Sequence, residues 1–72
     1  KLRYFLMNYK GRIISKSESI LEGLKRMDSL DRKSLIVIEQ NKFFGLVSAG
    51  DIQRAIIQNK PLATPIEDIL RK

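Results

Sequence analysis

The turn that follows residue 47 carries the side chains of this chain that are best suited to contact a polar ligand. Ser48 supplies a hydroxyl, Asp51 a carboxylate, and Gly50 lies between them. Arg54 follows three residues after Asp51, so on a helix the two side chains share a face and can pair with each other. Ser and Asp are also preferred caps of a helix start, each contributing about 1 kcal/mol. The turn therefore either caps the next helix only or also holds a ligand.

The segments on both sides of this turn have clear patterns. Residues 43–48 (FFGLVS) are predicted to form a strand, and residues 51–58 (DIQRAIIQ) a helix that ends before Pro61. The predicted apolar face of this helix contains four residues: Ile52, Ala55, Ile56 and Ile57. A strand that runs into a helix would hold the turn at the edge of a sheet.

A capped helix is predicted earlier in the chain, after a short strand at residues 12–15 (RIIS). Ser19 with Glu22 three residues later forms the pattern of a capping box. The expected core face of this helix contains three residues: Ile20, Leu24 and Met27. Gly23 lowers helix stability by about 1 kcal/mol relative to Ala, which suggests the close approach of another backbone.

A hairpin is predicted in the middle of the chain. Residues 35–39 (LIVIE) are apolar on both alternating faces, as is typical of a central strand covered on both sides. Residues 40–42 (QNK) form a tight connection in which Asn41 can adopt the left-handed conformation.

The last residues are predicted to form a short closing helix. Thr64 would be its cap, Pro65 its first residue, and Glu67 would complete a second capping box.

The predicted order of elements is β-α-β-β-α. The first two strands can form a right-handed parallel crossover and the last two an antiparallel hairpin. The predicted fold class is α+β, a small three-stranded mixed sheet packed against two helices. With 72 residues, the chain forms one domain that buries only about 60% of its unfolded surface, so we expect it to depend on a partner.

The composition excludes most catalytic classes. The chain has no Cys and no His, so disulfides, zinc sites and nucleophiles paired with His are ruled out. Its sequence contains no glycine-rich phosphate loop and no paired catalytic carboxylates. We therefore predict that the segment is not an enzyme and has neither catalytic residues nor a metal site. The absence of Cys fits a reducing compartment, and we expect a cytoplasmic location.

The charge is concentrated near the start of the sequence. Residues 1–16 carry +5 of the net charge of +6. We assign residues 1–8 to a basic and aromatic arm, and residues 9–72 to the domain. The arm's aromatic residues could stack on bases, but a solvated segment is the commoner outcome, so nucleic-acid binding is disfavoured. The longest apolar run is far too short to span a bilayer, which needs about 20 residues.

The sequence resembles the CBS domain, the regulatory module of the cystathionine β-synthase type. The pattern GLVSAGDI (45–52) is similar to that family's Gly-apolar-x-Thr/Ser-x-x-Asp signature. The resemblance extends over roughly residues 9–72 and covers four segments, the third of which contains this signature: IIS (13–15), SESILEGL (17–24), LIVIEQNKFFGLVSAGDIQRAI (35–56) and ATPIEDIL (63–70).

This resemblance implies a pair of modules with a nucleotide between them. CBS motifs occur in pairs whose sheets pack about a pseudo-two-fold axis, so a second motif is expected, as a homodimer or as a tandem copy in a longer chain. The clefts of such pairs commonly bind AMP, ADP or ATP as a regulatory ligand, and no other cofactor is expected. Other CBS modules bind nothing and serve as dimerisation units, so both functions stay open.

The resemblance also implies roles for single residues. Ser48 would bind a phosphate or ribose oxygen, and Asp51 would accept hydrogen bonds from the two ribose hydroxyls. The amides around Gly50 and the Arg54 guanidinium would meet the phosphate. By analogy, Ile14 would line an adenine slot.

Further expectations concern two lysines, an attached domain and the natural first residue. Lys16 and, more weakly, Lys60 would be further phosphate contacts. The segments GDIQRAI (50–56) and TPIEDIL (64–70) are most similar to CBS pairs attached to sugar-phosphate nucleotidyltransferases, which implies an attached effector domain. The stretch MNYK (7–10) is similar to the start of that group, which would make Met7 the natural first residue.

Departures from the family pattern affect the ligand more than the fold. Ser48 replaces the more frequent Thr but keeps the hydroxyl, and Ala49 stands where the nucleotidyltransferase-linked group often has an acid. Phe44 is bulky for its place before Gly45.

Overall fold

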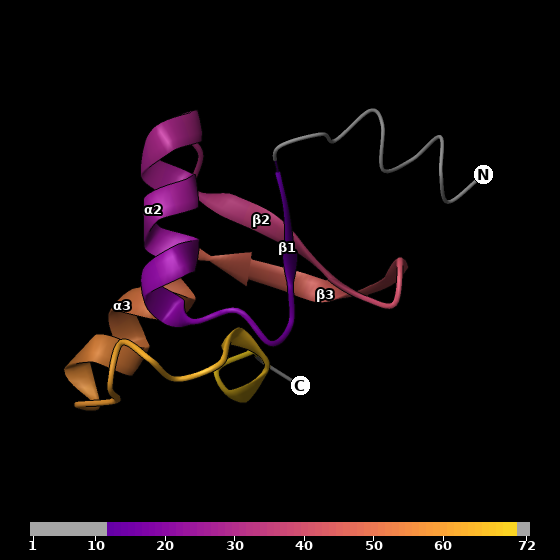
Figure 1. The fold of residues 1–72 in the computed structure, drawn as a ribbon. Helices are drawn as coiled ribbons and strands as arrows, with labels where there is room; N and C mark the ends of the chain where they lie inside the picture. Colours follow the sequence, from indigo (N-terminus) through magenta and orange to yellow (C-terminus); the bar gives the residue numbers. More distant parts are fainter. Residues whose placement is uncertain (1–11, 71–72) are drawn as a thin grey trace.

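A computed structural model describes residues 12–70, so the predictions for the arm at residues 1–8 and for Met7 lie outside the described residues. The elements follow in this order: β1 (Ile13–Ser15), α2 (Ile20–Leu30), β2 (Ser34–Glu39), β3 (Lys42–Ser48), α3 (Ala49–Ile57) and the 3₁₀ helix η1 (Ile66–Asp68). Strand β2 is central, parallel to β1 and antiparallel to β3. Both helices pack on one side of the sheet (Figure 1). The predicted α+β fold with the order β-α-β-β-α is confirmed.

The hairpin between β2 and β3 forms as its sequence predicts. Gln40 and Asn41 both adopt positive φ angles, 51° and 63°, which are the values of the two-residue turns that match the twist of paired strands. The register between β2 and β3 shifts by one residue between Val37 and Ile38. Val37 lies opposite Gly45, whereas Ile38 lies opposite Phe43. This bulge leaves Phe44 as an extra residue between the two pairs, and Phe44 is 41% exposed.

The core lies between the sheet and the two helices. It contains nine buried residues: Ile14, Ile20, Met27, Leu35, Val37, Val47, Ile52, Ala55 and Ile66. On α3, Ile52 and Ala55 are buried as predicted, but Ile56 and Ile57 are 46% and 78% exposed. Of the predicted apolar face, only Ile52 and Ala55 therefore contribute to the core of the chain.

The start of α2 matches its prediction in part. The Ser19 hydroxyl accepts a hydrogen bond from the Glu22 amide at 3.1 Å. The Glu22 carboxylate lies 3.5 Å from the Arg26 guanidinium, one turn along the helix. Glu22 thus pairs along the helix, in place of the predicted return to the cap.

Gly23 provides space for side chains and not, as predicted, for another backbone. A Cβ atom at this position would lie 3.2 Å from the Ile66 Cδ1 atom and 3.5 Å from that of Ile52. The absence of a side chain on α2 therefore lets the segment that carries Ile66 pack into the core.

The predicted closing helix does not form. Only the short η1 is present, and its cap is Pro65, without a side-chain hydrogen bond, in place of the predicted Thr64. Backbone pairing with the chain before α2 explains the difference, because the Ile66 amide donates to the Glu18 carbonyl and the Glu67 amide to that of Lys16. These bonds satisfy the donors that a helix start would leave unpaired.

Candidate functional site

The turn between β3 and α3 is held by a complete capping box. The Ser48 hydroxyl accepts from the Asp51 amide at 3.1 Å, and the Asp51 carboxylate accepts from the Ser48 amide at 2.8 Å. Asp51 also forms an ion pair with Arg54 one turn farther along α3. Asp51 is only 8% exposed, and among residues 12–70 it is the buried charged residue. The capping role predicted for Ser48 and Asp51 is therefore confirmed.

The surroundings of Asp51 favour its ionised form. Burial raises the pKa of its carboxyl, but hydrogen bonding to Ser48 and the positive charge of Arg54 outweigh this effect. The pKa of Asp51 is consequently lowered from the ordinary aspartate value.

This lowered pKa makes stability depend on pH. The group is more acidic folded than unfolded, so its stabilising effect is complete above the unfolded pKa, near 4, and is lost as pH falls through the folded value. We expect the free energy of unfolding of the wild type to fall towards that of Asp51→Asn as pH drops from 7 to about 2.5. Urea unfolding of both proteins across this range measures the difference. A difference that is independent of pH would contradict the prediction.

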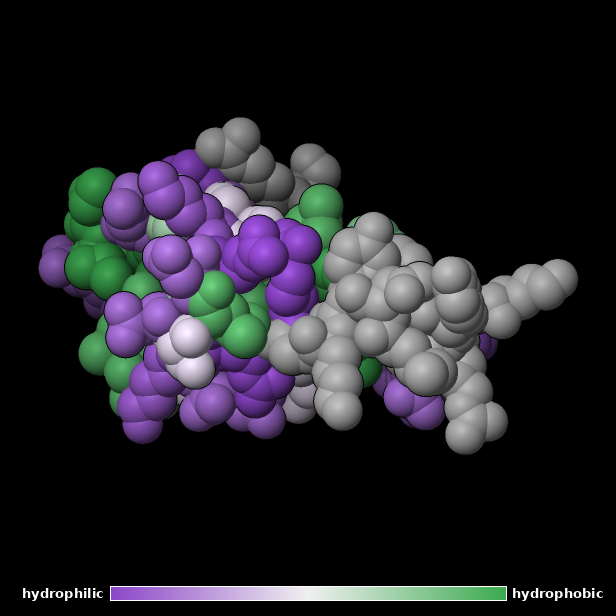
Figure 2. Space-filling model, turned by 90° about the horizontal axis from the view of Figure 1, so that it is seen from above, coloured by the Kyte–Doolittle hydropathy of each residue, from purple (hydrophilic) through white to green (hydrophobic). Residues whose placement is uncertain are grey.

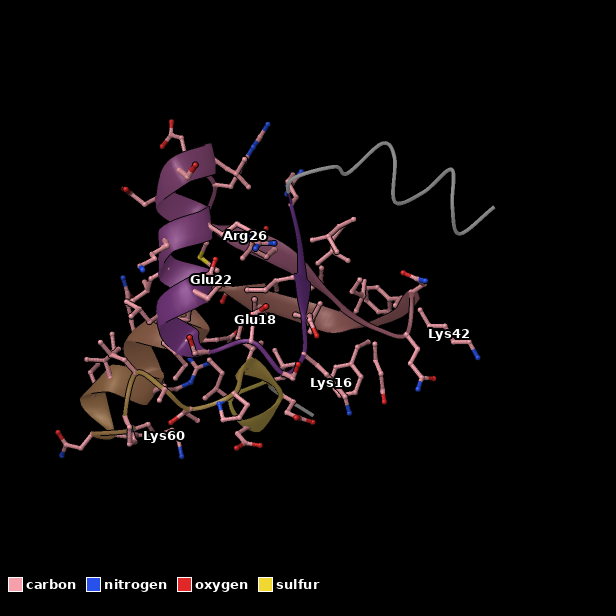
Figure 3. All side chains as sticks on the ribbon, viewed as in Figure 1. Lys16, Glu18, Glu22, Arg26, Lys42 and Lys60 are labelled. Atoms are coloured by element: carbon pink, nitrogen blue, oxygen red, sulfur yellow. The ribbon has the colours of Figure 1, made fainter. Side chains whose placement is uncertain are left out.

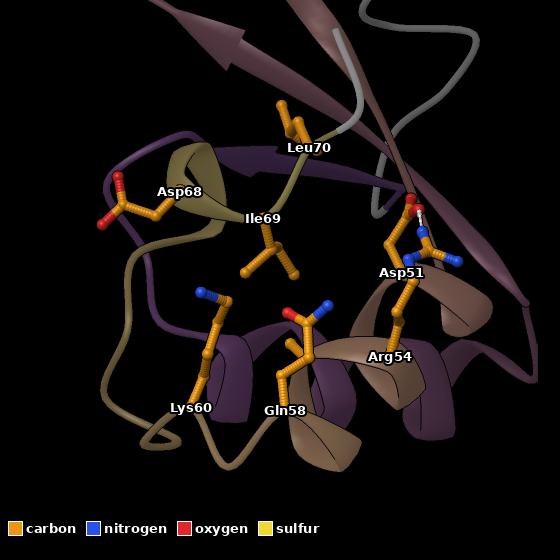
Figure 4. A pocket seen from close by; sticks show the side chains of 8 residues that line it. Asp51, Arg54, Gln58, Lys60, Asp68, Ile69 and Leu70 are labelled. Carbon is orange, nitrogen blue, oxygen red and sulfur yellow. Dashed lines mark hydrogen bonds and ion pairs between the residues drawn. The ribbon is translucent and has the colours of Figure 1, made fainter.

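Asp51 and Arg54 also line a pocket of about 290 Å³. Figure 4 shows this pocket between α3 and the segment that carries η1, residues 64–70. Gln58 and Lys60 contribute polar groups from the end of α3 and the turn after it. Asp68 lies on the opposite wall, and Figure 4 shows its carboxylate directed away from Arg54 and Gln58.

The opposite wall also contains apolar residues, Ile69 and Leu70. Leu70 reaches the sheet at Gly45, where a Cβ atom would lie 3.4 Å from its Cδ1 atom. The glycine of the β3 signature thus keeps this wall close to the sheet.

The structure brings four of the six predicted site residues together and separates two. Ser48, Gly50, Asp51 and Arg54 lie within the first two turns of α3 or next to them. Ile14 is in the core and only 1% exposed, because its place on β1 opposite Val37 directs its side chain towards the helices. Its predicted contact with adenine would require this core position to open.

Lys16 lies at the other end of the sheet. Its amide donates to the Ile38 carbonyl, whereas Ser48 lies opposite Ser34, four residues or about 13 Å earlier on β2. Figure 3 shows Lys16 at the end of β1, far from Lys60 in that view.

The ammonium group of Lys16 already has partners. It lies 3.2 Å from the Glu39 carboxylate, 3.3 Å from that of Glu67, and 5.2 Å from the centre of the Phe44 ring. Hydrogen bonding to Glu39 and Glu67 raises the pKa of Lys16. In this structure Lys16 joins the sheet to η1 and does not approach Asp51.

Lys60 was predicted as a weaker phosphate contact, whereas two other polar residues of the pocket, Gln58 and Asp68, were not predicted as site residues. Gln58 lies seven residues after Asp51 and thus on the same helical face, a signal that the sequence contained. Asp68 reaches the pocket of Asp51 and Gln58 only because residues 64–70 fold back towards α3. The spacing of residues in the sequence does not predict this contact. Within residues 12–70, no group of three or more His, Cys, Asp or Glu residues could hold a metal ion.

Comparisons with solved structures show the CBS domain fold. Chains with this fold include a cystathionine β-synthase domain protein fused to a Zn-ribbon-like domain (19% identity, TM-score 0.77, 83% of this chain and 89% of that one). A CBS domain protein from Pyrobaculum aerophilum, solved in complex with AMP, matches at 20% identity and a TM-score of 0.74 over 79% of this chain. A signal-transduction protein with CBS domains from Burkholderia ambifaria matches at 25% identity and a TM-score of 0.73 over 82% of this chain.

The extent of these matches differs. The chain spans 46% of the Pyrobaculum chain and 47% of the Burkholderia chain, about half of each. No protein-family model matches the sequence, and no curated protein does.

None of the helices within residues 12–70 has the length and apolar character that a membrane span requires.

Proposed function

We propose that this chain is a non-catalytic regulatory CBS module that pairs with a second CBS motif and binds AMP, ADP or ATP. The observation that carries the proposal is the position of Asp51, whose carboxylate is held ionised at the edge of a pocket between α3 and residues 64–70. The related fold from Pyrobaculum aerophilum, solved with AMP, supports an adenine nucleotide as the ligand.

The chemistry of the turn suits a nucleoside. Each carboxylate oxygen can accept more than one hydrogen bond, so Asp51 can keep its bond from the Ser48 amide and still accept from ribose hydroxyls. The guanidinium of Arg54 can exchange its contact with Asp51 for a phosphate oxygen, a ligand to which guanidinium groups bind well. The amide of Gly50, at the start of α3, favours negative charge nearby.

Pairing would complete the cleft. The matched chains from Pyrobaculum and Burkholderia are about twice as long as this one, which leaves room in each for a second unit of the same size. The sheet side exposes Phe43, Phe44 and Leu46, at 56%, 41% and 60%. Apolar side chains are also exposed on the helical side, where Figure 2 shows green patches at the left. We assign pairing to the sheet side, in line with the sheet packing that the resemblance implies.

The site would act through an attached domain. Nucleotide occupancy would change the geometry of the pair and so bias an effector domain, for which the sequence resemblance favours a sugar-phosphate nucleotidyltransferase. We place this regulator in the cytoplasm.

Substitutions in the two exposed apolar surfaces test the proposal. The wild type is expected to be a dimer at tens of micromolar. Leu46→Glu is expected to give a folded monomer that binds nucleotide at least tenfold more weakly, because Leu46 is exposed within one chain but would be buried in the pair. Sedimentation equilibrium and calorimetric titration measure both effects.

Ile57→Glu is the matched variant on the helical side, and it should remain dimeric. A wild-type monomer would contradict the proposal. Dissociation by Ile57→Glu and not by Leu46→Glu would contradict the assignment of pairing to the sheet.

A ligand-free interaction module is the second candidate. The complete capping box favours it, because Ser48 and Asp51 already have a structural role without a ligand. In that case Asp51→Asn would alter stability slightly and no nucleotide would bind to the dimer.

A further inference from the structure

The polar groups of the pocket form a row along α3. Asp51, Arg54 and Gln58 are three and four residues apart, so they lie on one face of the helix. The seven residues from Asp51 to Gln58 span about 10 Å along the helix axis. Lys60 extends the row past the end of the helix, and Figure 4 shows its side chain and that of Gln58 directed towards the wall that carries Ile69.

Charge is balanced at one end of this row and not at the other. Arg54 is paired with Asp51. Within the described part of the chain, no ion pair forms on Lys60, although Asp68 lines the same pocket. The Gln58 side chain likewise forms no hydrogen bond with residues 12–70. The far end of the pocket thus offers a cation and an amide donor to a ligand.

We infer that this pocket selects a nucleotide with a chain of phosphates, a nucleoside di- or triphosphate, over a monophosphate. The inference rests on the proposed function, because it takes the ribose to lie at Asp51. A single phosphate bound beside Arg54 stops short of Lys60. A second and a third phosphate continue along α3 to the Gln58 amide and the Lys60 ammonium.

The opposite wall affects this selectivity in two ways. Ile69 and Leu70 are half-buried apolar residues that reduce the water around the row, which strengthens electrostatic contacts there. Asp68 lies on the same wall with its carboxylate directed away from Gln58, and its negative charge weakens the binding of phosphates through charge repulsion. Removal of that charge should therefore favour the longer phosphate chains.

Titration of the dimer with AMP and ATP tests the inference. The wild type is expected to bind ATP about fivefold to tenfold more tightly than AMP. Lys60→Met keeps the length of the side chain and should remove most of this difference, because it weakens ATP binding much more than AMP binding. Asp68→Asn should increase the preference for ATP over AMP. Lys25 is an exposed lysine on α2, and Lys25→Met should leave this preference unchanged.

The outcomes separate this inference from the proposed function. If AMP binds in an Asp51-dependent way but ATP binds no more tightly, or if Lys60→Met weakens both nucleotides equally, only the selectivity is wrong. If no nucleotide binds to a well-formed dimer, both are wrong.

Discussion

Replacing Asp51 with Asn is expected to reduce adenine-nucleotide affinity by about tenfold to a hundredfold, with little loss of stability. Charge-assisted hydrogen bonds from the ribose hydroxyls contribute about 1.5 to 3 kcal/mol each, and about 1.4 kcal/mol corresponds to a factor of ten. The amide oxygen of Asn can still accept from the Ser48 amide, so the cap is largely kept. Calorimetric titration gives the affinity, and urea unfolding gives a stability change of about 1 kcal/mol or less.

Asp28→Asn is the matched control for this substitution. Asp28 is exposed on α2, and its replacement changes the net charge by the same amount. Affinity should be unchanged in this variant. An equal loss in both variants would show an effect of net charge, and full affinity in Asp51→Asn would remove Asp51 from the site.

Replacing Ile66 with Ala is expected to cost about 2 to 5 kcal/mol of the free energy of unfolding. Ile66 is fully buried, and it packs at the position that Gly23 leaves open on α2. Such a loss is a large fraction of the total for a domain of this size, about 4 to 11 kcal/mol. Urea unfolding followed by circular dichroism measures it.

Leu62→Ala provides the comparison for the core substitution. Leu62 is 44% exposed in the turn after α3, and the same kind of truncation there should cost much less. Equal costs at the two positions would show that residues 64–70 are not part of the cooperative core.

The sequence predicted the elements that depend on local patterns. The left-handed Asn41, the apolar central strand and the Ser19 cap are each determined by a few neighbouring residues, and all are present. The closing helix was predicted wrongly because backbone pairing between residues 64–70 and the chain before α2 replaced the local capping pattern of Thr64 and Glu67. Such long-range pairing has no short-range signal.

In the candidate site, too, the sequence predicted the contacts between residues close together in the chain and missed those that depend on tertiary packing. The side chains of Ser48, Asp51 and Arg54 meet because they lie one helical turn apart. Lys16 was predicted as a further phosphate contact, but it lies at the far end of the sheet and pairs with two carboxylates. The pocket wall at Asp68 depends on tertiary packing, which the spacing of residues did not contain.

The most direct test of the account is a calorimetric titration of AMP, ADP and ATP into wild-type chain, with the mass of the protein in solution determined at the same concentration. We predict saturable binding of at least one of the three nucleotides to a dimer, and an affinity about tenfold to a hundredfold weaker in Asp51→Asn. No heat of binding from a well-formed dimer would contradict the nucleotide site and leave Ser48 and Asp51 as the caps of α3.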